Sequence, residues 1–464
     1  MIAAGGEKAW RGALALAIAL FAAQAMLWLN PGYFSHDELQ WGARAAVESW
    51  RQLPFVSFLD WCAFQFRPLT FNLWLLLSHA LFESPRAFHA AFVTLGTFNA
   101  LLLASTLRRV GCDHTVAHGA ALVFALGPVA AWVHGWVGCL ADLLWLALLL
   151  AALRALLALH PPKADPIRSP WLAPTTPARL AAAAGIGALT TALGLLAKEA
   201  ALSIPALIGL VALALRLPRA WLAATIAGGA VALAYLALRL AVLASAPGDS
   251  PYGIQPAWLP GNWLLYQAFP GAIGIQEVQV LAWARDWRWL PALFGLGALV
   301  ACLWRASPKL ALGWLAGVSA ALAPVLLLAY QANQYAYGAM ACSCAAGALA
   351  WRHLDRWHAW LLALAAALSV VHGVQIQKRM LYTGRLQATF SAELVTAAQR
   401  QPQGAIALWP ELERDHPIYA RLSHELLDSA GTRLGSRVQM APSRAAASHR
   451  ITADGRVLPM EHAP

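Results

Sequence analysis

The sequence predicts an all-α polytopic membrane protein with about eleven transmembrane helices. Its 464 residues are 60% hydrophobic and only 12% charged, with a mean hydropathy of +0.56. In soluble proteins, about 45–50% of the residues are hydrophobic and about 25% are charged. The hydrophobic residues form long blocks such as 12–29, 180–197 and 310–329, close to the roughly 20 residues that a helix needs to cross a bilayer. This composition excludes a soluble enzyme.

The expected spans occupy most of the first 377 residues. Each is an apolar run ended by charged or Pro-rich residues, the hydropathy signature of a helix in lipid. The sequence places them at residues 12–29, 87–107, 115–133, 137–157, 180–197, 200–216, 220–245, 289–304, 310–330, 336–351 and 358–377. We expect 1–377 to form a transmembrane domain. Residues 378–464, where the composition turns polar, are expected to form a polar tail or a small extracytoplasmic domain with helices.

Basic residues orient the expected spans, because short loops rich in Lys and Arg stay in the cytoplasm. Their distribution predicts a cytoplasmic N-terminus and places loops 30–86 and 246–288, with the segment from Lys378, on the outer side. The net charge of +11 therefore reflects topology and not nucleic-acid binding. The residue bias suggests a bacterial inner membrane. An alternative is that the first span is a signal peptide cleaved after Ala23-Gln24-Ala25.

The apolar segment 70–82 is too short to span, so we expect it to lie in the membrane interface or to re-enter. If it crosses, the orientation of everything downstream inverts. The residues after the first span predict a second interfacial element. Residues 39–51 place apolar side chains on one stripe and charged ones opposite, which is typical of an amphipathic helix lying along the membrane.

Two adjacent carboxylates, Asp37 and Glu38, stand at the start of this amphipathic helix. Ser35-x-x-Glu38 has the spacing of a capping box, so Glu38 has either a structural role there or a role in the chemistry of the pair. Asp37 at the membrane surface is placed to take a proton from an attacking hydroxyl. The pair also has the hard oxygen ligands that a divalent cation prefers. No metal-binding cluster is recognisable elsewhere in the sequence.

Other polar residues stand out against the apolar background. Arg67 precedes the apolar stretch 70–82, and Lys198 with Glu199 marks a short outer turn between two spans. Arg239, near the end of its span, is expected to snorkel outward. Asp142 is too short to snorkel, so it lies near the outer mouth or is paired inside the bundle.

These residues resemble, in order and spacing, the GT-C superfamily of membrane glycosyltransferases. The similarity is greatest to the protein O-mannosyltransferase-like branch, which includes the transmembrane and tetratricopeptide-repeat mannosyltransferases. The residues that carry the resemblance are Asp37-Glu38, Phe66-Arg67-Pro68-Leu69-Thr70, His89, Asn99, Pro128, Trp136, Asp142, Leu195-Leu-Ala-Lys-Glu199 and Arg239. The chain differs from the family in lacking the repeats and in reading Gln331-Ala-Asn-Gln-Tyr-Ala-Tyr where an Arg-Tyr pair is usual.

The resemblance implies inverting transfer of a sugar from a polyprenyl-phosphate carrier to a hydroxyl of a protein, lipid or glycan at the outer membrane face. It implies Asp37 as the base and Glu38 as its helper, with Arg67, Lys198 and Arg239 neutralising the phosphate. His36, Asp142, Glu199 and Tyr335 would support them. No cofactor is implied, and the partners are membrane lipid and substrate.

Two other functions fit the same composition. A transporter or lipid flippase would use the buried charges as a pathway, and it predicts inverted repeats and broken helices. A non-catalytic scaffold would explain the missing family residues. His134, just before the fourth span, is expected to be a hydrated loop histidine.

Overall fold

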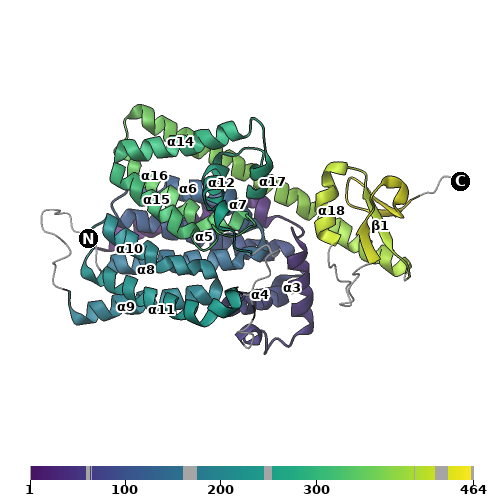
Figure 1. Ribbon diagram of the computed structural model, residues 1–464, viewed down its shortest axis with the longest axis horizontal. Coiled ribbons are helices and arrows are strands. Elements are labelled where there is room, and N and C mark those ends of the chain that lie inside the picture. The colour runs from purple at the N-terminus through teal and green to yellow at the C-terminus, as the bar shows by residue number, and fades with distance from the viewer. Residues whose placement is uncertain are drawn as a thin grey trace.

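The computed structural model describes residues 2–58, 63, 65–159, 175–244, 253–401, 403–423 and 437–460. Long helices pack side by side into a bundle, and a small C-terminal unit projects from one end of it (Figure 1). The bundle is all-α, as the sequence predicts. One large apolar core runs through it, and a second core fills the C-terminal unit.

Up to Ala244, the described residues form eleven α-helices. They are α1 (Ile2–Ala22), α2 (Ala25–Trp28), α3 (His36–Val47), α4 (Pro68–Leu81), α5 (Pro85–Arg109), α6 (His114–Leu126), α7 (Pro128–Gly135), α8 (Leu140–Leu159), α9 (Pro177–Ala197), α10 (Ile204–Ala214) and α11 (Arg219–Ala244). Short 3-10 turns separate several of them, namely η1 (Val56–Phe58), η2 (Val137–Cys139) and η4 (Glu199–Ser203). Pro begins α4, α5, α7 and α9, because its missing N–H is not needed in a first turn.

The second half completes the bundle and adds the C-terminal unit. Its helices are α12 (Leu259–Ala268), α13 (Val278–Trp283), α14 (Trp289–Ala306), α15 (Pro308–Leu322), α16 (Tyr337–Trp351), α17 (Arg356–Arg400) and α18 (His416–Ser423). The 3-10 turns are η5 (Pro256–Trp258), η6 (Phe269–Gly271), η7 (Asn333–Ala336), η8 (Glu413–Asp415) and η10 (Arg444–Ala446). The strands are β1 (Ile406–Pro410), β2 (Val438–Met440), β3 (His449–Ile451) and β4 (Val457–Pro459).

Six helices of the described residues are long and apolar enough to cross a membrane. They are Pro85–Arg109, Val137–Leu159, Pro177–Ala197, Arg219–Val242, Trp289–Ala306 and Arg356–Arg400. A seventh candidate is the pair α6 and α7, which is bent by 60°. Arg11–Ala22, Glu199–Ala214 and Pro308–Leu322 are shorter apolar helices. The chain is therefore compatible with a multi-pass membrane protein, and the larger count of about eleven spans stays a prediction.

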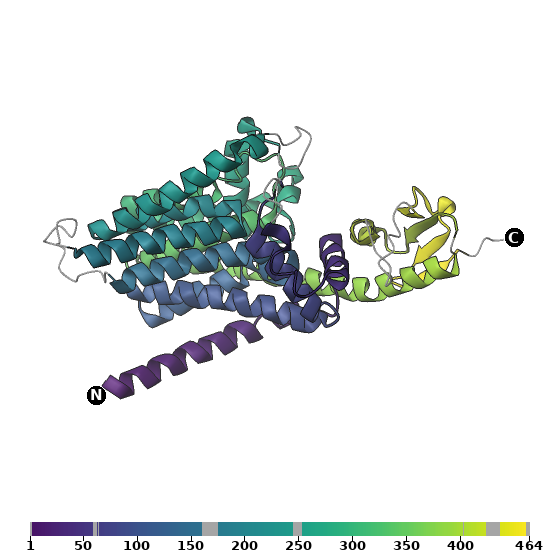
Figure 2. The same cartoon turned by 90° about the horizontal axis from the view of Figure 1, so that it is seen from below.

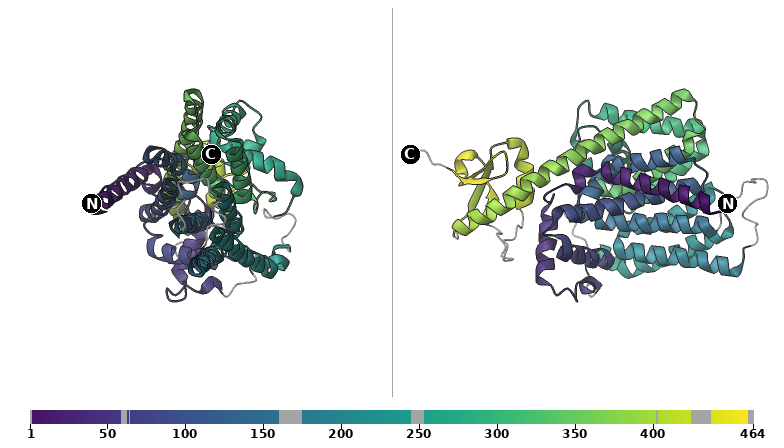
Figure 3. Two further views of the ribbon diagram at one scale, coloured as in Figure 1. Left: turned by 90° about the vertical axis from the view of Figure 1, so that its left-hand side faces the viewer. Right: turned by 180° about the vertical axis from the view of Figure 1, so that it is seen from behind.

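The two ends of the bundle differ in what they carry. The N-terminus lies at one end, and α3, α4 and the C-terminal unit lie at the other (Figure 2). The view from behind gives the same arrangement (Figure 3). The described parts of the first outer loop and the C-terminal unit therefore share one end of the molecule. We call this end the α3 end.

The segment 70–82 forms most of α4, a helix of 14 residues packed beside α3. Its length of about 21 Å is less than the roughly 30 Å of a bilayer core. Trp41 of α3 stacks against both Phe71 and Trp74 of α4, with ring centroids 4.8 Å apart in each contact. The two helices thus form one layer at the α3 end.

The C-terminal unit departs from the expected boundary and content. α17 runs without a break across residue 378. The change from apolar to polar side chains at this point does not interrupt the backbone hydrogen bonds of the helix. Beyond it, four short strands form a sheet in the order β2-β1-β3-β4, with only β3 and β4 antiparallel. The expected small helical domain contains a helix, α18, but also this sheet, which the sequence did not indicate because strands of three to five residues leave little period-two signal.

Candidate functional site

Glu38 holds the start of α3 against the bundle. Its Oε2 accepts hydrogen bonds from the backbone N–H of Phe34 (2.6 Å) and of Ser35 (2.7 Å). Its Oε1 accepts from the N–H of Val137 in η2 (3.1 Å). The capping box expected from Ser35-x-x-Glu38 is present. Glu38 therefore has a structural role in joining the first loop to the connection between α7 and α8.

Burial changes the acidity of this carboxyl group. Only 1% of Glu38 is exposed. Desolvation raises its pKa to about 8, although the three backbone N–H groups favour the charged form and partly oppose the rise. The neighbouring Asp37 charge raises the pKa a little further. Glu38 consequently holds its proton over much of the physiological pH range.

Asp37 lies beside Glu38 in the first turn of α3 and is half-buried. Its negative charge is favoured there by the helix dipole. Asp37 is also close enough to Cys139 of η2 to interact electrostatically with its thiol. The side chain of His36, expected to support the pair, lies outside the part of the chain that the structure describes.

Lys198 and Asp142 form an ion pair inside the α3 end of the bundle. Lys198 ends α9 in an extended conformation, as predicted for a turn between two apolar helices. Its Nζ lies 2.5 Å and 2.6 Å from the two carboxylate oxygens of Asp142, in the first turn of α8. Both residues are buried, at 4% and 3% exposure. The sequence left two alternatives for Asp142, a position near the outer mouth or a pairing inside the bundle, and in the structure Asp142 is paired.

Tyr335 of η7 covers this pair. The Lys198 Nζ lies 5.2 Å from the centroid of the Tyr335 ring, in cation–π geometry. The segment that leads into η7 is fixed by its amide side chains. Gln331 donates to Asn262 Oδ1 (2.8 Å), and Asn333 Oδ1 accepts from the Val278 N–H (2.7 Å).

Arg67 and Glu199 form a second, more exposed ion pair. The Nε and Nη2 atoms of Arg67 lie 2.8 Å and 2.7 Å from Glu199 Oε2, and the two side chains are 17% and 19% exposed. Arg67 occupies the N-cap position of α4. The Thr70 hydroxyl donates to the Ala197 carbonyl (2.8 Å), which fixes the start of α4 to the end of α9.

Arg239 turns into the protein and does not snorkel outward as expected. Only 3% of it is exposed. Its Nη2 donates to the Ala63 carbonyl (2.6 Å), and the guanidinium lies 5.6 Å from the Phe66 ring centroid. The first loop therefore covers the end of α11, which supplies a partner inside the protein that the sequence does not reveal.

The predicted site residues form a connected cluster at the α3 end. Cys139 interacts electrostatically with Asp37, Glu38, Asp142 and Lys198. Asp142 is within reach of Arg67, and Tyr235 is within reach of Arg67, Glu199 and Arg239. We call Asp37, Glu38, Arg67, Asp142, Lys198, Glu199 and Arg239 the charged cluster.

A neutral network behind the cluster was not expected from the sequence. His134 is fully buried, so its interpretation as a hydrated loop residue was wrong. Its Nδ1 lies 2.6 Å from Gln24 Oε1, and its Nε2 lies 2.8 Å from the Tyr337 hydroxyl. Asn99 donates to that hydroxyl (3.3 Å) and to the Leu143 carbonyl (3.0 Å). The sequence had singled out Asn99 and Pro128, which begins α7, but not their connection through His134 and Tyr337.

The charged cluster does not include a recognisable metal site. Within the described ranges, no three His, Cys, Asp or Glu residues lie close enough together to hold a metal ion. A divalent cation at Asp37 and Glu38 stays a prediction.

Comparisons with protein-family models, curated proteins and solved structures find no match for this chain. Function is therefore argued from the site itself.

Proposed function

We propose that the protein is an inverting glycosyltransferase of the GT-C type that moves a sugar from a polyprenyl-phosphate carrier to a hydroxyl acceptor. The proposal includes about eleven spans, a bacterial inner membrane and an extracytoplasmic α3 end. It rests on the order of motifs in the sequence and on one structural observation. That observation is the convergence of Asp37 and the Lys198–Asp142 pair on η2, with Arg67 and Arg239 at the same end.

The reaction needs a base, a leaving-group site and a hydrocarbon surface. Asp37 takes the proton of the acceptor hydroxyl, whose oxygen bonds to the anomeric carbon on the face opposite the phosphate. The bond between sugar and phosphate breaks, and its electron pair leaves on the phosphate. Arg67, Lys198 and Arg239 compensate the resulting charge. The long carrier lies against the apolar helices.

The remaining members of the cluster act as positioning residues. Asp142 holds the Lys198 ammonium, and Glu199 holds the Arg67 guanidinium, each by contacts of 2.5–2.8 Å. Glu38 fixes the α3 N-terminus and thereby the backbone of Asp37. A carboxylate beside each cation lowers the cost of burying it. It also lets the phosphate bind a preformed site.

The test replaces the proposed base and follows the product. Envelope glycans are profiled by mass spectrometry in cells that produce the wild-type chain, Asp37→Asn or no protein. We expect Asp37→Asn to match the deletion while the protein still inserts. Glu48→Gln is the matched control, because Glu48 caps the other end of α3 and pairs with exposed Arg44. An unchanged glycan in Asp37→Asn overturns the base assignment.

A second probe tests the phosphate site without knowledge of the sugar. Polyprenyl phosphate, the product common to every donor of this class, is titrated into the purified chain and its binding is measured by native mass spectrometry. Arg67→Gln should weaken binding about ten-fold, since a charged hydrogen bond to phosphate is lost. Equal affinity in both chains would favour the scaffold function.

A lipid transporter remains the second candidate because of one observation. The pair α6 and α7, bent by 60°, has the length and composition of a broken span or a re-entrant loop, and transport folds often contain broken helices. However, the polar groups that contact α7 at His134, namely Gln24 and Tyr337, are buried and hydrogen-bonded to that histidine. If Asp37→Asn leaves the glycans unchanged but stops movement of a fluorescent lipid across vesicles, the transporter function replaces the enzyme.

A further inference from the structure

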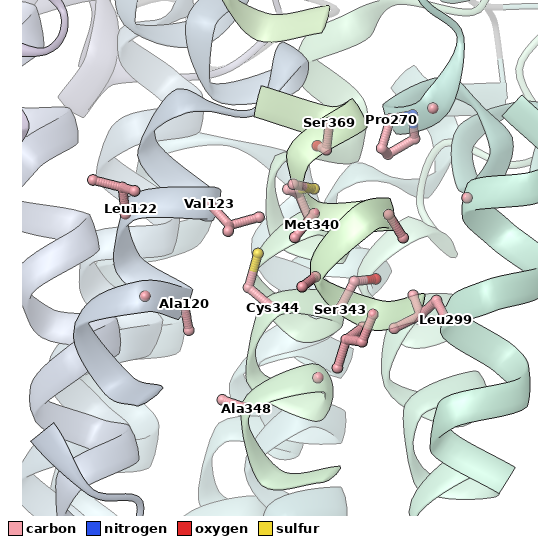
Figure 4. Close-up of a pocket in the computed structure, with 18 of the residues that line it drawn as sticks. Ala120, Leu122, Val123, Pro270, Leu299, Met340, Ser343, Cys344, Ala348 and Ser369 are labelled. Atoms are coloured by element: carbon pink, nitrogen blue, oxygen red, sulfur yellow. The ribbon is translucent and has the colours of Figure 1, made fainter. Parts of the chain in front are cut away.

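A cavity of about 420 Å³ lies between α6, α14, α16 and α17, away from the charged cluster. Its size falls within the roughly 300–1,000 Å³ of small-molecule sites. Ser369 and Pro270 lie near one end of the cavity and Ala348 near the other (Figure 4). The described residues that line it include no Asp, Glu, Lys, Arg or His.

The cavity follows the axis of α16. One stripe of this helix faces it, at the helical spacing of residues 339, 340, 343, 344, 347, 348 and 351. From 339 to 351 the helix rises about 18 Å, close to the roughly 15 Å that one lipid leaflet contributes to the bilayer core. Nine of the twelve lining residues from α16 and α17 are Ala, Gly, Ser or Cys, and these small side chains leave room for a narrow chain.

The end near Pro270 carries two polar groups that need a partner. Gln267 and Ser369 line the cavity and are 8% and 4% exposed. Neither Gln267 Nε2 nor the Ser369 hydroxyl has a hydrogen-bond partner among the described residues. Buried donors without partners are rare because their desolvation is costly. A ligand oxygen at this end would satisfy both.

The cavity also reaches the apolar surface of the bundle. Leu122 and Trp351 line it and are each 39% exposed. In a multi-pass membrane protein such a surface faces lipid, so a ligand dissolved in the bilayer can enter from the side without crossing water. The charge of the ligand is also restricted, because no charged side chain lines the wall.

We propose that this cavity binds one acyl chain of a membrane glycerolipid, with its ester carbonyl accepting hydrogen bonds from Gln267 and Ser369. The chain lies along the α16 stripe. This site is separate from the phosphate site of the proposed function, because it offers no cation. Ala336 lines the cavity and follows Tyr335, which covers Lys198, so the lipid would brace η7 from behind.

The test uses photo-crosslinking in vesicles. The full chain is reconstituted with phosphatidylcholine that carries a diazirine in one acyl chain, and crosslinked peptides are mapped by mass spectrometry. Gly347→Leu fills the cavity, since the nearest atoms to an added Cβ are side-chain atoms of Leu362 at 3.9 Å. Gly313→Leu is the matched control, because nothing lies within 4 Å and the residue does not line the cavity.

The expected result is crosslinking on α16, lost in Gly347→Leu and kept in Gly313→Leu. Gln267→Leu should reduce labelling about ten-fold through the missing hydrogen bond, and it keeps the test decisive if Gly347→Leu fails to fold. Labelling that is equal in all variants, or absent from α16, overturns the proposal. The proposal is also overturned if polyprenyl phosphate displaces the probe and diacylglycerol does not. This result does not depend on the glycan profile of the Asp37→Asn variant.

Discussion

The substitution Asp142→Asn would leave the Lys198 ammonium buried without its counter-charge. In the structure the Nζ contacts both carboxylate oxygens, and the two side chains are only 5% and 4% exposed. Removing one partner of a buried pair typically costs about 3–5 kcal/mol. We therefore expect Asp142→Asn to lower the free energy of unfolding by about that amount.

The companion variants separate the ion pair from simple packing. Lys198→Met should cost a similar amount, because it leaves a buried carboxylate. The double variant Lys198→Met with Asp142→Leu removes both charges and should recover most of the loss, since apolar replacements of buried pairs are often neutral or stabilising. The proposed enzyme would nevertheless stay inactive in the double variant, because the phosphate loses a cation.

The assay is reversible unfolding in mixed detergent micelles, followed by far-ultraviolet circular dichroism. Arg305→Gln is the control, because Arg305 pairs with Asp355 at 3.6 Å while both side chains are 58% and 45% exposed. Arg305→Gln should leave the free energy of unfolding unchanged, because exposed ion pairs contribute little to stability. An equal loss in Asp142→Asn and the control, or a double variant less stable than either single variant, would refute the reasoning.

Three further predictions follow from single contacts. The pKa of Glu38 is about 8 in the folded protein, against an ordinary value of 4.5. Between these two pH values the carboxyl group releases its proton when the protein unfolds, so thermal stability should fall from pH 5 to pH 8. Glu38→Gln should flatten that pH profile. Gly373→Ala should destabilise by about 1–3 kcal/mol in denaturant titration, because its Cβ would overlap the Leu126 carbonyl; an unchanged midpoint would contradict this packing. Tyr382→Phe removes a 2.7 Å hydrogen bond to buried Asp415, so limited proteolysis should release the C-terminal unit faster, by about 1.5–3 kcal/mol of local stability.

The sequence determined the class of protein and the position of most helices. Long apolar runs and their Pro and charge boundaries report local burial, and each helix satisfies its own backbone hydrogen bonds. The capping box at Ser35 and Glu38 was predictable for the same reason, because its partners lie within four residues. The count of about eleven spans stays a prediction, because α6, α7 and α10 are too short for their length alone to show whether they cross the membrane.

Only the tertiary structure decided the partners of the isolated charges. Lys198 meets Asp142 across 56 residues, and Arg67 meets Glu199 across 132, distances at which hydropathy and periodicity carry no pairing information. The same holds for buried His134, for inward-turned Arg239 and for the sheet of the C-terminal unit. A buried charge must find a counter-charge somewhere in the bundle, but which one depends on how distant helices pack.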